Sequence, residues 1–137
     1  MTRPDNILIR LTVALLILLC MLVSGCRRDL SKALNSQGSL KAVMYESGEP
    51  SFERYIEQSS REFRELVQWA ERNSDGWKPN MITVKPGILF EGRDFSLILR
   101  PESATFIYGG GQFARPIPTE EYSHFHRLLG GFTVSGF

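Results

Sequence analysis

Cysteine, histidine and surplus charge are all scarce in this sequence. Its 137 residues include two cysteines and two histidines, and its formal net charge is only +1. A near-neutral chain without a basic stretch lacks the electrostatic attraction that nucleic-acid binding requires, so we expect no nucleic-acid partner. With 42% hydrophobic and 23% charged residues, the composition excludes a disordered, a collagen-like or a multi-span membrane protein.

The few histidines and cysteines also argue against catalysis and metal binding. His124 and His126 are two positions apart on a predicted helix and point to different faces, which does not suit a shared metal ion. No serine lies in a G-x-S-x-G context. Glu91 and Asp94 are candidates for acid–base chemistry, but their place in a predicted turn favours solvated charges. We therefore expect no enzymatic activity, no metal site and no cofactor.

The first 25 residues differ from the rest of the chain. Arg3 and Arg10 precede an uncharged run from Leu11 to Gly25, LTVALLILLCMLVSG. This run is shorter than the roughly 20 apolar residues that span a bilayer, and extending it toward the N-terminus would include Arg10. A basic start, a short apolar core and small residues at its end are typical of a cleaved secretion signal.

The end of this segment resembles the lipobox of bacterial lipoprotein precursors. In Val23-Ser24-Gly25-Cys26, an aliphatic residue and two small residues precede a cysteine. The resemblance implies that residues 1–25 are removed as a signal peptide. It also implies that Cys26 is lipidated, with a diacylglyceryl group on its sulfur and a fatty acid such as palmitate on its new amine. By the same resemblance, arginine rather than aspartate at Arg27 points to the outer membrane, facing the periplasm.

Cysteine usage agrees with this interpretation. Cys20 would leave with the signal peptide and acylation would occupy Cys26, so no cysteine pair remains for a disulfide. An exported domain of this kind depends on its own hydrophobic core. The alternatives are a plain signal peptide or an uncleaved anchor that contains a cysteine.

Residues 26–49 are polar and rich in serine, and we interpret them as a tether between the lipid anchor and the domain. The spacing of apolar residues fits a short helix near Leu30. In the alternative, Leu40, Val43 and Met44 already begin the domain, as a strand or as a docking turn.

Residues 50–137 have the pattern of one small α+β domain. Apolar positions from Phe52 to Ala70 recur at helical spacing, with Ser51 as the N-cap and an interruption near Ser59, and they predict a long amphipathic helix. Short β-prone runs separated by turn residues then predict a three- to four-stranded antiparallel meander. The expected strands are Met81–Val84, Ile88–Phe90, Phe95–Leu99 and Thr105–Tyr108.

A second, shorter helix completes the predicted fold. Thr119 suits its N-cap, and Gly130-Gly131 suits its end. Trp69 and Trp77 are expected in the core, with Trp77 docking just after the first helix. The predicted architecture is therefore a long helix, an antiparallel meander and a short helix in a single domain.

A glycine-rich segment after the last expected strand is the best candidate for a partner-binding surface. Gly109-Gly110-Gly111 is not followed by the lysine and the serine or threonine that a P-loop requires. We expect instead a mobile loop in which Tyr108, Phe113 and Arg115 contact a protein partner, because aromatic side chains and arginine are frequent anchors. In the alternative, Phe113 and Ile117 pack over the edge of the sheet.

These observations favour a non-catalytic, lipid-anchored protein-binding module of the cell envelope. Small lipoproteins that face the periplasm include inhibitors, immunity proteins and accessory subunits of envelope assemblies. The expected partners are the membrane, through Cys26, and a periplasmic or envelope protein. The alternative function is a small periplasmic ligand carrier or hydrolase whose site is assembled from residues far apart in the sequence.

Overall fold

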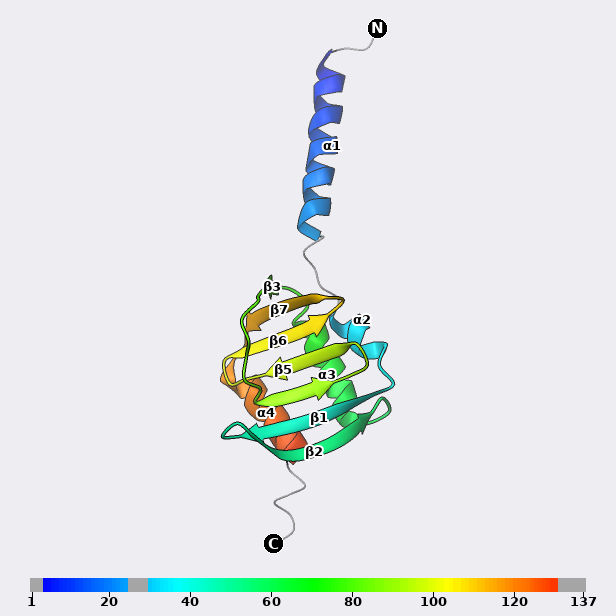
Figure 1. Ribbon diagram of the computed structural model, residues 1–137. Coiled ribbons are helices and arrows are strands. Elements are labelled where there is room, and N and C mark those ends of the chain that lie inside the picture. Colours follow the sequence, from blue (N-terminus) through cyan, green and yellow to red (C-terminus); the bar gives the residue numbers. More distant parts are fainter. Residues whose placement is uncertain (1–3, 25–29, 131–137) are drawn as a thin grey trace.

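A seven-stranded antiparallel sheet, covered on one face by helices, is the framework of the protein (Figure 1). The computed structural model describes residues 4–24 and 30–130. The strand order is β2-β1-β4-β5-β6-β7-β3, so β2 and β3 form the two edges. The strands are β1 (Ser39–Glu46), β2 (Glu49–Glu57), β3 (Lys78–Pro79), β4 (Ile88–Glu91), β5 (Phe95–Leu99), β6 (Ser103–Tyr108) and β7 (Gly111–Pro116). The helices are α1 (Pro4–Ser24), α2 (Leu30–Asn35), α3 (Arg61–Arg72) and α4 (Thr119–Gly130).

This sheet corrects the predicted meander of three or four strands, and the predicted long helix is wrong in its first half. Residues 49–57 form β2, in which Ile56 is buried and Tyr55 is exposed. Phe52 and Ile56 are four residues apart, which places them on one face of a strand as well as on one face of a helix. Helix α3 begins only after Ser60, whose Oγ accepts a hydrogen bond from the Phe63 amide at 3.2 Å. Ser60, rather than Ser51, is therefore the N-cap.

Residues 30–49 already belong to the globular part, which corrects the tether prediction over this range. Leu30, Leu34 and Leu40 are at most 1% exposed. Helix α2 and strand β1 therefore belong to the core, as the alternative strand interpretation of residues 40–44 proposed.

Two hairpins depend on residues with positive φ. Ser47 and Gly48 (φ 52° and 80°) connect β1 to β2, and Gly109 and Gly110 (φ 61° and 77°) connect β6 to β7. Two-residue hairpin turns of this handedness match the natural twist of the strands. The glycine run therefore forms a tight turn, which corrects the expectation of a mobile loop.

The segment that leads into β4 also differs from its prediction. No strand covers the expected range Met81–Val84. The chain instead passes from the short edge strand β3 to β4 without regular structure. The predictions for β5 and for α4 are confirmed, and β4 and β6 are each longer than expected.

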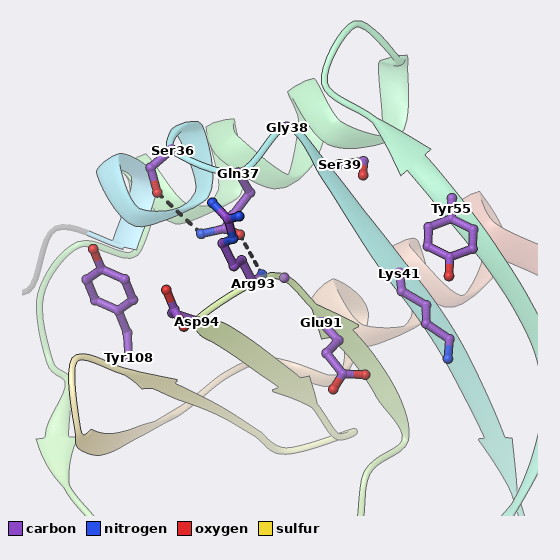
Figure 2. Close-up of a pocket in the computed structure, with 11 residues that line it drawn as sticks. Ser36, Gln37, Gly38, Ser39, Lys41, Tyr55, Glu91, Arg93, Asp94 and Tyr108 are labelled. Carbon is purple, nitrogen blue, oxygen red and sulfur yellow. Dashed lines mark hydrogen bonds between the residues drawn. The ribbon is translucent and has the colours of Figure 1, made fainter.

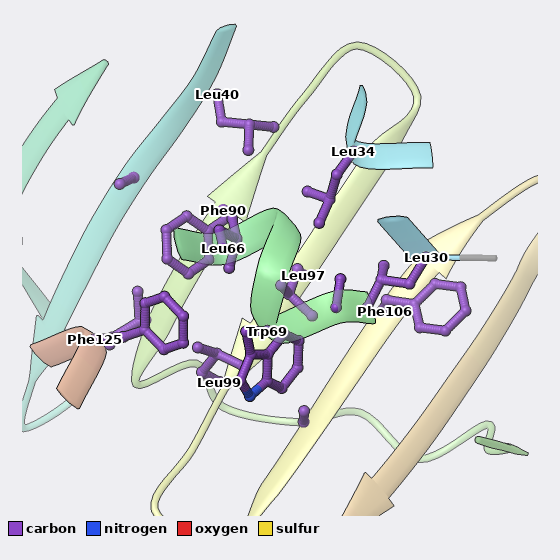
Figure 3. Packing of buried hydrophobic residues seen from close by; sticks show 14 of the residues in the cluster. Leu30, Leu34, Leu40, Leu66, Trp69, Phe90, Leu97, Leu99, Phe106 and Phe125 are labelled. Atoms are coloured by element: carbon purple, nitrogen blue, oxygen red, sulfur yellow. The ribbon is translucent and has the colours of Figure 1, made fainter. Parts of the chain in front are cut away.

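The core lies between the sheet and the three helices of the globular part (Figure 3). Trp69 of α3 is 1% exposed and makes edge-to-face contacts with Trp77 and Phe125, with ring centroids 6.4 and 6.0 Å away. Trp77 packs in turn on Phe106 of β6 at 4.7 Å. Such aromatic pairs add to the free energy gained from burial. Both tryptophans are core residues, as predicted.

Helix α1 stands apart from this core. Each of its side chains from Asp5 to Leu19 is exposed, including Leu8 at 70%. Within residues 4–24 and 30–130, none of the helices combines the length and the apolar character needed to cross a bilayer.

Candidate functional site

A surface groove of about 530 Å³ opens where α2 and the start of β1 meet the turn between β4 and β5 (Figure 2). It collects residues from four elements that are distant in the sequence. Its lining residues are Ser36, Gln37, Gly38, Ser39, Lys41, Tyr55, Glu91, Gly92, Arg93, Asp94 and Tyr108.

Gln37 fixes the floor of the groove. Its side chain is buried, and its Oε1 accepts a hydrogen bond from the Arg93 backbone amide at 2.8 Å. Its Nε2 donates to Ser36 Oγ at 3.3 Å. A Cβ at Gly92 would collide with the Gln37 amide, so the glycine permits this close approach. The β4–β5 turn is thereby bound to the end of α2.

Strand register brings three polar side chains of the groove into one row. Lys41 of β1 pairs with Tyr55 of β2 on one side and with Glu91 of β4 on the other. Lys41 Nζ also lies 3.3 Å from Glu53 Oε1, and this hydrogen bond and its charge raise the Lys41 pKa above the ordinary value. Lys41 therefore stays protonated at neutral pH and carries a full positive charge at this side of the groove.

The other side of the groove carries opposite charges next to a second tyrosine. Arg93 and Asp94 follow each other on the exposed β4–β5 turn, and Asp94 lies between Arg93 and Tyr108 in Figure 2. Tyr108 is 42% exposed and Tyr55 is 65% exposed. The groove thus presents two accessible phenol rings separated by side chains of both charge signs.

The predicted partner-binding residues are not brought together. Tyr108 lies in the groove, at the end of β6. Phe113 is only 7% exposed and packs on Phe106 with ring centroids 5.2 Å apart, so its ring belongs to the core. Ile117 is buried as well. Phe113 as a partner contact is therefore corrected in favour of the packing alternative.

Arg115 is occupied by a structural contact. Its Nη1 donates to the Asp75 carbonyl at 2.6 Å and lies 3.7 Å from the Asp75 carboxylate, while the guanidinium sits 5.9 Å from the centre of the Trp77 ring. It therefore holds the segment after α3 against β7, at some distance from Tyr108. Cys26, the predicted lipidation site, lies outside the described residues.

Sequence reasoning missed most of the groove. Gln37 and Lys41 fell within the expected tether, and Tyr55 fell on the expected helix. The sequence suggests Glu91 and Asp94 only as an acid–base pair in a turn, and both are exposed at the groove. The available signal was the dipeptide Ser47-Gly48 between two alternating stretches, which is typical of a hairpin.

The histidines lie elsewhere. His124 Nε2 is 2.8 Å from Glu65 Oε2, linking α4 to α3, and this hydrogen bond lowers the Glu65 pKa below its ordinary value of 4.5. His126 lies beside Tyr122, with ring centroids 6.0 Å apart. Within the part of the chain that the structure describes, no group of three or more histidine, cysteine, aspartate or glutamate side chains could hold a metal ion.

Comparison with known proteins adds no relative: no protein-family model, no curated protein and no solved structure matches this chain.

Proposed function

We propose that this chain is a lipid-anchored protein of the cell envelope whose globular domain binds another protein without catalysing a reaction. The observation that carries the proposal is the groove at the β4–β5 turn, where Tyr55 and Tyr108 remain exposed around charged side chains.

The composition of the groove favours a protein partner. Small-molecule pockets are mostly apolar and enclose their ligand. This groove is lined mainly by polar and charged side chains, and its accessible anchors are two tyrosines and Arg93. Tyrosine and arginine are enriched among the residues that dominate the binding energy of protein interfaces. Lys41 and Asp94 would supply charge complementarity and so set the orientation of the partner.

The lipid anchor is supported by the residues before the domain. The Val23–Cys26 lipobox resemblance provides the acylation site. From Asp5 to Leu19, helix α1 exposes its apolar side chains, in keeping with a segment that is removed from the mature protein. A chain acylated at Cys26 with more than one fatty-acid chain would be held firmly at a membrane.

The anchor is tested by the intact mass of the protein from membranes of its native host, with Cys26→Ser as the control. We expect a mature species that begins at Cys26 and carries acyl mass, and no such species from the control. An unmodified chain that begins at Met1 would overturn the anchor.

Partner binding is tested by photo-crosslinking in the same membranes. A photoreactive residue at exposed Ser39 reports on the groove, and one at exposed Glu102, in the β5–β6 turn, is the control position. We expect a defined adduct from position 39 that is absent from position 102. The adduct should be lost in Tyr55→Ala and retained in Tyr55→Phe. Identical adducts from both positions, or insensitivity to Tyr55→Ala, would overturn the groove as a binding site.

A further inference from the structure

Two neighbouring apolar side chains project from the edge of the sheet beyond β3. Met81 is 91% exposed and Ile82 is 69% exposed, which makes them the most exposed large apolar residues of the described range 30–130. Isolated exposed apolar residues are ordinary on a protein surface, whereas adjacent ones that the backbone holds outward form an apolar surface that a partner or a membrane can cover.

The backbone around these side chains is held in place. The Asn80 amide donates to the Gln112 carbonyl at 3.0 Å, which continues the pairing of β3 with β7. The Ile82 amide donates to Asn80 Oδ1 at 2.8 Å, and Gln112 Nε2 donates to the Ile82 carbonyl at 2.7 Å. Both apolar side chains are therefore presented by a hydrogen-bonded backbone at the β3–β7 edge.

The chain enters the domain on this same side of the sheet. Helix α2 begins beside β6 and β7 (Figure 1), and Leu30 lies next to Phe106 of β6 (Figure 3). Cys26 precedes Leu30 by four residues, a distance of at most about 14 Å even when fully extended. A lipid on Cys26 would therefore keep this side of the domain close to the bilayer.

Charge distribution distinguishes the two edges of the sheet. Exposed Lys78 and Lys85 flank the apolar pair, and the nearby Asp75 is paired with Arg115. The opposite edge, β2, exposes the acidic side chains Glu49, Glu53 and Glu57, of which Glu53 is paired with Lys41. Anionic headgroups attract the first edge and repel the second.

We propose that Met81 and Ile82 contact the bilayer in which Cys26 is anchored, so that the sheet stands with its β3 edge on the membrane and its β2 edge in the aqueous phase. This inference rests on the proposed lipid anchor. It leaves Tyr55 of β2 and Lys41 of β1 several strand spacings of about 4.8 Å above the surface and open to a protein partner.

The test uses the mature acylated protein in vesicles of phosphatidylethanolamine and phosphatidylglycerol. Because Cys26 is acylated and Cys20 is removed with the signal, Ile82→Cys provides a unique site for an environment-sensitive fluorophore. Glu49→Cys, on the β2 edge, is the matched control, since both positions are exposed. We expect a lipid-borne quencher to reduce the emission of the label at position 82 several-fold more than that of the label at position 49.

The outcomes separate this inference from the proposal on which it rests. An acylated chain whose two labels are quenched equally would overturn the membrane contact and leave the anchor intact. A chain without acyl mass would overturn both.

The double variant Met81→Ser, Ile82→Ser provides a second readout, with the fluorophore attached at Glu102→Cys. The label should gain rotational freedom when the membrane contact is lost, and an unchanged fluorescence anisotropy would contradict the contact.

Discussion

Trp69 on α3 donates its indole N–H to the Glu121 carboxylate on α4, with 2.9 Å between Nε1 and Oε2. The two residues are 52 positions apart in the chain. Their hydrogen bond ties together two helices that cover the same face of the sheet, and it satisfies the single polar atom of a side chain that is otherwise surrounded by core residues.

Removal of this acceptor should destabilise the domain. We expect Glu121→Ala to lower the free energy of unfolding by about 1–3 kcal/mol, because the indole N–H is left without a partner. Glu121→Gln retains a carbonyl oxygen at the same position and should cost clearly less. Urea unfolding of the two variants measures the difference, and equal losses would show that the hydrogen bond contributes little.

A methyl group at Gly87 has no room. Its Cβ would lie 2.8 Å from Tyr122 Oη and 2.9 Å from the Leu99 carbonyl, which also accepts a hydrogen bond from the Gly87 amide. We expect Gly87→Ala to lower the free energy of unfolding by about 1–3 kcal/mol because the backbone at the start of β4 must shift. Gly38→Ala is the control, since no atom lies within 4 Å of its Cβ. Similar stabilities for the two variants would contradict the crowding.

Phe113 and Tyr108 should respond in opposite ways to truncation. Phe113→Ala empties a core position and should cost about 3–5 kcal/mol of unfolding free energy. Tyr108→Ala removes a ring that is 42% exposed and lies 6.4 Å from the Phe95 ring, so it should cost clearly less stability than Phe113→Ala while it weakens the crosslinked adduct at Ser39. Thermal unfolding of each variant, with the adduct yield measured in parallel, separates packing from binding. If the Phe113→Ala protein were as stable as the natural chain, the assignment of Phe113 to the core would be wrong and Phe113 would again be a candidate for partner binding.

The Glu65–His124 pair predicts a specific acid dependence. The hydrogen bond from His124 holds the Glu65 pKa below its ordinary value of 4.5 in the folded state, so the unfolded chain takes up the proton first as the pH falls. The carboxylate therefore stabilises the fold above pH 4.5, and this contribution is lost as the pH falls through the folded-state pKa. Glu65→Gln should be less stable than the natural chain at pH 6, and the gap should close in acid. A gap that is independent of pH between 6 and 3 would contradict this origin.

Part of the fold follows from local patterns. Alternation of Phe95, Leu97 and Leu99 predicts a strand buried on one face, and Thr119 with two following glutamates predicts the start of α4. Both elements are present. Each is an element in which a single periodicity fits the apolar residues.

The errors arise where two periodicities fit the same residues. Phe52 and Ile56 satisfy a helix and a strand equally, and only the pairing of β2 with β1 decides between them. Leu30 and Leu34 look sparse in a polar stretch, yet both are buried because they belong to the core that the seven-stranded sheet and its helices enclose. Tertiary contacts, rather than the local sequence, therefore decide whether such a segment is a helix or a strand and whether it is buried.

The groove was even less accessible to prediction. It joins Gln37, Lys41, Tyr55 and the turn 91–94, and no local spacing relates these positions. Of the groove residues, only Tyr108 is predicted from the sequence as a partner contact, because it is an aromatic residue beside three glycines. Phe113 and Arg115, which are proposed with it, instead stabilise β7: Phe113 packs on Phe106 and Arg115 pairs with Asp75.

The length of the edge strand β2 bears on whether copies of the protein aggregate. This nine-residue edge strand pairs with β1 on one side only, so its other side offers unpaired backbone groups to a second sheet. Lipid anchoring would confine copies to two dimensions and raise the rate at which such edges meet. Glu49, Glu53 and Glu57 recur at every fourth residue along the strand, and carboxylates of two approaching copies would repel each other before backbone hydrogen bonds form. Under the proposed anchoring, the acidic row that would keep this edge away from anionic lipid would also protect a crowded membrane population against sheet-to-sheet aggregation.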